Sequence, residues 1–414
     1  MQLFSETTFN NNGITYKPKA APIVAICLDG SADEYLDIAM AHDRMPNLKK
    51  MTVTGYRGMA RGALPSFTNV NNASIVTGVT PAVHGISGNF FYDDSKNEEV
   101  MMNSSAYLRT NTILAAAANA GRKVAVVTAK EKLRDILSFE LKGIAFSAEK
   151  ANQSKQETHG IEAADKELGI QTPAIYSADA SLFVLKAGVK LIEKGLADLL
   201  YLSLTDYMQH TYAPEAPEAL DFYAAIDREL GNLMNLGAIV GATADHGMNA
   251  KVNADGTPKV LFIESMLNEK FGEGFRVICP ITDPYVKHHG ALGSYVVVHV
   301  TDHSKIKIVQ QWLAQQDGIT EVYDRETAVH LLEQPADRIG DLVVLSGRDV
   351  VVGRTPQHHD LHALDGTLRS HGGRYEEMVP FFFSHPLTKE YRMRAGGDPR
   401  NFQIFDYTIN GTIL

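Results

Sequence analysis

The sequence predicts an α/β protein built on a central, mostly parallel sheet flanked by helices. Several short apolar runs rich in β-branched residues are each followed by a turn and a helical pattern. Strands of a parallel sheet read as continuous apolar runs because helices cover both faces of the sheet. A region with a different pattern interrupts this alternation, and the first pattern returns after it.

Four runs predict the strands of this sheet: residues 21–28 (APIVAICL), 124–128 (VAVVT), 198–204 (DLLYLSL) and 239–244 (IVGATA). A helix-like stretch ending at Gly121 precedes the second run. Three of the runs lead into an aspartate, namely Asp29, Asp206 and Asp245. Ligands of open α/β sheets bind beyond the carboxyl ends of the strands. Carboxylates crowded at that edge repel each other unless a cation neutralises them.

The segment 251–354 predicts a smaller α+β cap. It contains the strand-like runs 294–300 (SYVVVHV) and 341–345 (DLVVL) and an amphipathic helix over 305–316. We therefore expect a catalytic core formed by residues 1–250 and 355–414, with 251–354 inserted as the cap.

The bulk composition is that of a soluble globular chain of two or three domains, or of one large domain with an insertion. The 414 residues carry a net charge of -10, so non-specific nucleic-acid binding, which needs a basic surface, is not expected. Any selectivity for anions must come from local charges. The polar N-terminus, the absence of a membrane-length apolar run and the presence of only two cysteines predict a cytoplasmic protein without a membrane segment.

Candidate metal ligands occur in three short motifs. Asp206 and His210 (SLTDYMQHTYAP) lie one helical turn apart, Asp245 and His246 directly follow a predicted strand, and His371 (LRSHGGRYEE) precedes two glycines. Each motif alone is equally explained by a helix cap, a turn or a loop histidine. Other histidines lack such a setting, and we expect loop or solvated roles for them: His288, His289, His358, His359 and His362.

The segment 64–93 (LPSFTNVNNASIVTGVTPAVHGISGNFFYD) places Thr68 at the start of a predicted helix. Free N–H groups and the helix dipole favour an anion at that position. An ordinary N-cap threonine would look the same.

Taken together, these motifs resemble the nucleotide pyrophosphatase/phosphodiesterase-like branch of the alkaline phosphatase superfamily. The motifs that carry the resemblance occur in the family's order over residues 20 to 375: Asp29-Gly30, PSFTN, Thr77-Gly78, His84-Gly85-Ile86, Asp206 to His210, Asp245-His246-Gly247 and His371-Gly372-Gly373. Within the branch, the segments SFTNVNNASIVTGVTPAVHGISGNFFYD, TAKEKLR and SLTDYMQHTYAP are similar to members that cleave carbon–phosphorus bonds. The resemblance implies an alkaline phosphatase-like core.

The resemblance also implies two zinc ions per chain. One would be held by Asp206, His210 and His371, and the other by Asp29, Asp245, His246 and the Thr68 oxygen. Imidazole nitrogen and carboxylate oxygen suit zinc, although ligand type alone does not exclude manganese or iron.

The implied reaction is hydrolysis of phosphonoacetate to acetate and phosphate through a phospho-threonine on Thr68. The departing carbon leaves as an enolate, so a cation must stabilise the charge that develops on its oxygen. Lys130 and Lys132, which follow the run 124–128, and Asn89 would contact this small anionic phosphonate. A solvated lysine pair and a turn asparagine are the alternative interpretations.

Three other functions share the same motifs. A phosphodiesterase or nucleotide pyrophosphatase would keep the metals and Thr68 but differ in the pocket for the leaving group. A phosphomutase usually has a serine nucleophile, and an inactive metal-binding protein would not need Thr68. The oligomeric state stays open, with a homodimer as one alternative.

Overall fold

A computed structural model describes residues 4–283, 290–364 and 367–414, and it confirms the predicted α/β class. Seven strands form the central sheet, in the order β4-β19-β10-β3-β9-β7-β8. Their bounds are β3 Ile23–Cys27, β4 Tyr56–Arg61, β7 Val124–Thr128, β8 Ile144–Ser147, β9 Leu199–Ser203, β10 Ile239–Thr243 and β19 Met378–Phe383. The four strands predicted from the sequence are the adjacent strands β10, β3, β9 and β7, which are parallel. Strand β19 pairs antiparallel with β10 on one side and with the edge strand β4 on the other.

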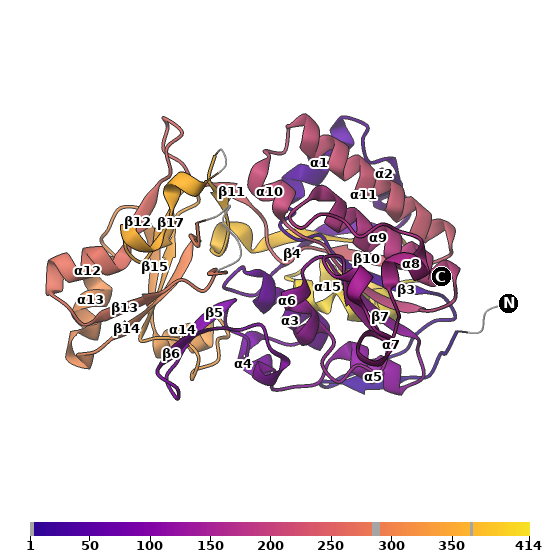
Figure 1. The fold of residues 1–414 in the computed structure, drawn as a ribbon, viewed down its shortest axis with the longest axis horizontal. Coiled ribbons are helices and arrows are strands. Elements are labelled where there is room, and N and C mark those ends of the chain that lie inside the picture. The colour runs from indigo at the N-terminus through magenta and orange to yellow at the C-terminus, as the bar shows by residue number, and fades with distance from the viewer. Residues whose placement is uncertain (1–3, 284–289, 365–366) are drawn as a thin grey trace.

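Helices cover both faces of this sheet (Figure 1), which explains why its central parallel strands are buried and mostly apolar. Val24 and Ile26 of β3 pack into one apolar cluster together with α9 (Ala178–Glu193) and α11 (Pro217–Asn235). The alternate residues of β3 belong to the opposite cluster, which includes α5 (Ile113–Asn119). Alternation of side chains across a strand therefore buries every position of β3.

A second lobe lies at one end of the molecule, and both chain termini lie at the other (Figure 1). Its antiparallel sheet has the order β13-β14-β16-β15. The strands are β13 Phe275–Ile278, β14 Tyr295–Val300, β15 Ile319–Asp324 and β16 Leu342–Ser346, with helices α12 Ile263–Phe271, α13 Ile306–Leu313 and α14 Arg325–Leu331.

The second lobe shares its apolar core with a segment from the first quarter of the chain. Phe91, on the hairpin formed by β5 (Phe90–Asp93) and β6 (Glu98–Met101), is buried in the same cluster as Val297 of β14. The division into a core and a 251–354 cap remains a prediction.

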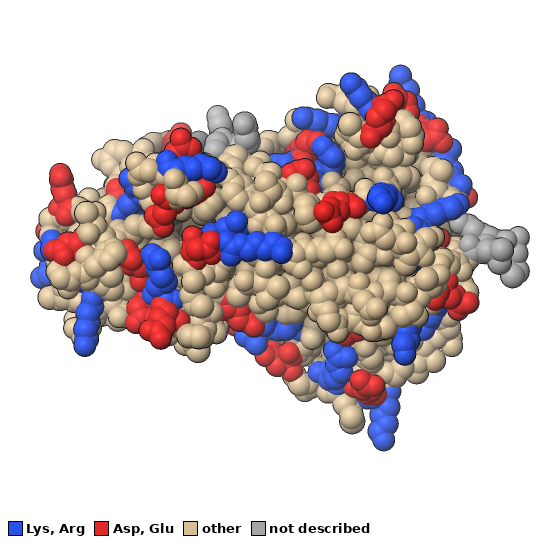
Figure 2. Space-filling view, turned by 90° about the horizontal axis from the view of Figure 1, so that it is seen from below, with Lys and Arg blue, Asp and Glu red and all other residues tan. Residues whose placement is uncertain are grey.

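Three further sequence features can be placed in the structure. The two cysteines are buried and free. Within the described part of the chain, no helix has the length and apolar character that crossing a bilayer requires. On the face drawn in Figure 2, basic and acidic side chains are interspersed and form no extended basic stripe.

Candidate active site

The three aspartates that follow sheet strands converge at the carboxyl edge of the sheet. Asp29 and Asp245 come two residues after β3 and β10, and Asp206 directly precedes helix α10 (Tyr207–Thr211) after β9. Strands β10, β3 and β9 are neighbours that end level with one another, so the aspartates emerge side by side. All three side chains are buried.

Three histidines point the same ring nitrogen into this cluster. His210, His246 and His371 are buried, and each places its Nδ1 within hydrogen-bond distance of a main-chain carbonyl. A carbonyl can only accept, so Nδ1 carries a proton, and Nε2 is the nitrogen that can bind a metal once it is deprotonated. The accepting carbonyls are those of Arg369 for His210 (2.7 Å), Gly247 for His246 (2.9 Å) and Ser66 for His371 (2.7 Å).

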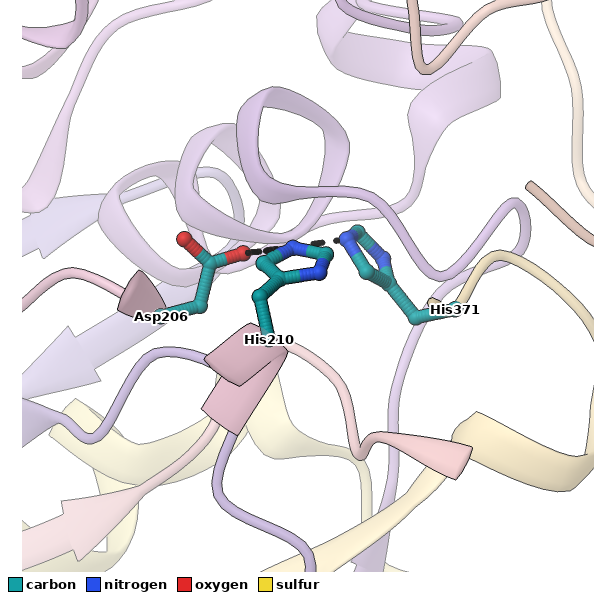
Figure 3. A group of neighbouring side chains, drawn as sticks. All are labelled: Asp206, His210 and His371. Carbon is teal, nitrogen blue, oxygen red and sulfur yellow. Dashed lines mark hydrogen bonds and ion pairs between the residues drawn. The ribbon is translucent and has the colours of Figure 1, made fainter. Parts of the chain in front are cut away.

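The side chains form two overlapping groups with metal-ligand geometry. Asp206, His210 and His371 present atoms within 4.8 Å of one another, and Figure 3 shows Asp206 and both imidazoles facing a common point. Asp29, His246 and the same Asp206 form the second group. Asp245 Oδ2 lies 3.7 Å from His246 Nε2, at the border of that group. The structure thus brings all six predicted Asp and His ligands together, and Asp206 lies between the two groups.

The electrostatics of the cluster favour a bound cation. Burial and the neighbouring Asp29 carboxylate raise the pKa of Asp245 to about 8. Although burial opposes it, the nearby carboxylates, Asp245 foremost, raise the pKa of His246 to about 9. Among the described residues, Asp29 Oδ1 is also a buried oxygen with no hydrogen-bond partner. Three buried carboxylates and three Nε2 lone pairs therefore fit divalent cations such as zinc.

Thr68 lies beside this cluster as the first residue of α3 (Thr68–Thr77). Its Oγ1 is 3.4 Å from His246 Nε2. One turn later, Asn72 donates its amide to Asp245 Oδ2 at 3.2 Å, so the same helix presents the hydroxyl and orients a carboxylate. Asn72 was not among the predicted site residues, although its place four residues after Thr68 on a helix could have indicated it.

The two lysines lie on the other side of the aspartates. Lys130 Nζ lies 2.8 Å from Asp206 Oδ1 and 3.1 Å from Asp29 Oδ2. Lys132 forms an ion pair with the buried Asp283. Burial and the Lys130 ammonium lower the pKa of Lys132, which makes this position costly for a cation unless anions face it.

A pocket of about 540 Å³ opens next to these lysines. Three lysines (Lys130, Lys132 and Lys150) and three acidic residues (Glu131, Glu149 and Asp283) line it, and Ile175 and Tyr176 contribute an apolar wall. The pocket therefore combines charged groups of both signs with a surface that can cover an organic substituent.

Asn89 contacts the start of α3. Its Oδ1 accepts the N–H of Asn69 at 3.1 Å. Of the other histidines, His359 has both ring nitrogens engaged by the main chain, at Gly290 and Arg354, and does not join the cluster. His288 and His289 lie outside the described residues.

The fold and this site place the chain in a known class. The family model of the type I phosphodiesterase / nucleotide pyrophosphatase family matches residues 23–374, and the chain belongs to that family, within the alkaline phosphatase superfamily. The fold is also that of murine ectonucleotide pyrophosphatase/phosphodiesterase 5, at 16% identity and a TM-score of 0.62 over 95% of this chain and 96% of that one.

Within this class, the chain is similar to the phosphonoacetate hydrolase of Sinorhizobium meliloti 1021, whose crystal structures contain phosphonoacetate or phosphonoformate. The identity is 44% over 98% of this chain and 99% of that one, with a TM-score of 0.93. A curated venom phosphodiesterase of Naja atra is 33% identical over 86 residues, which are 20% of this chain and 10% of that protein. The match thus spans about a tenth of the length of that curated relative.

Proposed function

We propose that this protein is a di-zinc hydrolase that cleaves the carbon–phosphorus bond of phosphonoacetate to give acetate and phosphate. The observation that carries the proposal is the place of the Thr68 hydroxyl, 3.4 Å from the Nε2 atom of His246 and at the start of helix α3. A hydroxyl beside a buried set of carboxylates and imidazoles has the surroundings that nucleophilic catalysis needs. The likeness to a phosphonoacetate hydrolase supports the choice of substrate.

The proposed metal ligands fall into two sets. Asp206, His210 and His371 would hold one ion, and Asp29, Asp245, His246 and Thr68 the other. When bound, the ions supply positive charge that lowers the pKa of a hydroxyl and neutralises phosphoryl oxygens.

Each step of the proposed reaction can be assigned to residues of the chain. Thr68 loses its hydroxyl proton to solvent and its Oγ1 attacks phosphorus, so that the new P–O bond forms as the C–P bond breaks. The expelled carbon takes up a proton from water to become the methyl group of acetate. The positive end of the α3 dipole, at Thr68, favours the phosphoryl oxygens. Water then hydrolyses the phospho-threonine and restores Thr68.

The leaving group is the difficult part of this reaction. Its charge passes through the carboxylate as an enolate, and we propose that Lys130 and Lys132 stabilise it because both line the pocket beside the aspartates. Asn89 is proposed to donate its amide N–H₂ to a phosphoryl oxygen, because its Oδ1 already accepts from the main chain of α3. Buried positive charge of this kind suits a compact trianion.

A phosphodiesterase acting on nucleotides is the second candidate. The family match favours it, and Tyr176 on the pocket wall offers an aromatic ring on which a base could stack. The lysines beside that ring favour the smaller, more highly charged substrate.

Comparing the two substrates on one preparation tests the proposal. The zinc-loaded protein is incubated separately with phosphonoacetate and with a p-nitrophenyl ester of thymidine 5′-monophosphate, while phosphate and acetate, or nitrophenol, are measured. We expect equal amounts of phosphate and acetate, and a kcat/KM for phosphonoacetate well above that for the diester. Faster release of nitrophenol would establish the phosphodiesterase instead. Metal analysis of the protein as purified, before zinc is added, tests for zinc, and sedimentation tests for the homodimer.

A further inference from the structure

Two buried residues outside the proposed ligand set connect the loops that carry His246 and His371. Glu376 and Lys251 have no exposed surface, and Lys251 Nζ lies 2.9 Å from Glu376 Oε1. Lys251 directly follows β11 (Asn249–Ala250), the strand after His246, and Glu376 ends the short helical turn after His371. We propose that Glu376, held by Lys251, is a positioning residue that sets both imidazoles for metal binding.

One hydrogen-bond chain runs from Glu376 to His371. Glu376 Oε2 accepts the N–H of Gly373 at 3.1 Å, and the carbonyl of Gly373 accepts the hydroxyl of Ser66 at 2.6 Å. The carbonyl of Ser66 in turn accepts Nδ1–H of His371 at 2.7 Å. The Glu376 carboxylate therefore controls, through two main-chain groups, the direction in which His371 Nε2 points.

A second chain runs from Glu376 to His246. The main-chain carbonyl of Glu376 accepts the N–H of Gly247 at 2.8 Å, and the carbonyl of Gly247 accepts Nδ1–H of His246 at 2.9 Å. The Glu376 side chain also accepts the Asn249 amide at 2.6 Å, which ties it to the strand after His246. The two imidazoles are held face to face, with ring centroids 3.4 Å apart and planes within 5°.

Lys251 anchors this unit to the second lobe. Its Nζ also donates to Ser294 Oγ at 2.7 Å and to the carbonyl of Arg348 at 2.8 Å. Ser294, next to β14, donates its own N–H to the carbonyl of His371 at 2.9 Å. Because all three Nζ protons are used, the Glu376 carboxylate is fixed in place by a charge-assisted bond in a buried setting.

An ion pair whose only role was to stabilise the fold would not need hydrogen-bonded connections to the proposed metal ligands. The chain offers such a pair as a matched control: Arg122 and Asp198 are equally buried, with Nε and Oδ1 2.8 Å apart. Arg122 packs its guanidinium against the carbonyls of Ala21 and Asp198, at the start of strands β3 and β9 and away from the cluster.

The test compares Glu376→Gln with Asp198→Asn, because each replaces a buried carboxylate by an amide of the same shape. A glutamine cannot accept from Gly373 and from Asn249 and Lys251 together, so one donor loses its partner. Zinc-loaded wild-type and variant proteins are titrated to equilibrium with a chromogenic chelator, and the zinc affinity obtained is compared alongside the unfolding midpoint. We expect both variants to lose stability, while only Glu376→Gln binds zinc about 10- to 100-fold more weakly.

The inference is overturned if folded Glu376→Gln binds zinc as tightly as the wild type. It is also overturned if Asp198→Asn loses as much zinc affinity as Glu376→Gln does. Should Glu376→Gln not fold, Ser66→Ala interrupts the chain to His371 without touching the ion pair, and unchanged zinc retention there overturns the inference as well. The inference rests on the proposed metal site. Wild-type protein that takes up no zinc would overturn both the proposed metal site and the positioning role of Glu376. If the wild type binds zinc and the Glu376 variant binds it equally tightly, only the positioning role is overturned.

Discussion

Histidine 84 gives the structure a pH dependence that can be measured apart from catalysis. It ends helix α4 (Pro81–His84) and is fully buried. Its Nδ1 accepts the N–H of Ile86 at 3.1 Å, so Nε2 carries the proton and donates to Ser74 Oγ on helix α3 at 2.8 Å. Burial, with a smaller contribution from the charge of Arg338, lowers the pKa of His84 from 6.5 to about 3.

The sign of the effect follows from the lowered pKa. The folded state keeps His84 neutral between pH 6.5 and about 3, whereas the unfolded chain binds a proton there. The contribution of neutral His84 to the free energy of unfolding is fully present above pH 6.5 and is lost as the pH falls below that value. Between pH 8 and pH 5, about 1.5 pH units lie inside this window, and at about 1.4 kcal/mol per unit the loss is roughly 2 kcal/mol.

The matching variant is His84→Gln, because glutamine can accept from Ile86 and donate to Ser74 but does not titrate. Urea unfolding of both proteins is measured at pH 8 and at pH 5, with chelator present so that metal release affects neither. We expect the wild type to lose about 2 kcal/mol more than the variant between the two pH values. An equal loss in the two proteins would show that His84 does not remain neutral in the folded state.

Two further predictions concern the proposed site. Thr68→Val keeps the shape of the side chain but removes the hydroxyl, so phosphonoacetate turnover should fall by at least about a thousandfold while metal analysis finds near-normal zinc; substantial turnover would remove Thr68 from the nucleophile role. His371→Ala removes one of the three ligands in its set, so elemental analysis should find about one zinc fewer per chain, with hydrolysis reduced in step; a variant with full zinc and full activity would show that His371 is not a ligand.

Local pattern was enough to predict the four adjacent parallel strands β10, β3, β9 and β7 and the aspartates that follow three of them. The strands β3, β7, β9 and β10 are buried at every position and mostly apolar because both faces of the sheet are covered, and this burial leaves a signal within five residues. The edge strand β4 (YRGMAR) was not predicted, because a partly exposed strand carries polar residues and loses that signal.

The resemblance to the family pointed to the ligands, but not to the contacts that orient them. Asp206 and His210 share one helical turn, so their proximity can be predicted from spacing alone. His371 reaches the same point from 161 residues further along the chain than His210, and its Nδ1 partner is Ser66, on a third segment. Such contacts depend on how the segments pack, and no local periodicity encodes them.

The sequence by itself determined which residue types stand at the carboxyl edge of the sheet, because strand burial and the aspartates that follow are local properties. Tertiary structure alone decided that three imidazoles turn Nε2 to a common point, that Asn72 orients Asp245, and that the pair of Lys251 and Glu376 connects two ligand loops. Hydrogen bonds between distant segments depend on the packed backbone, which is complete only when both lobes are in place.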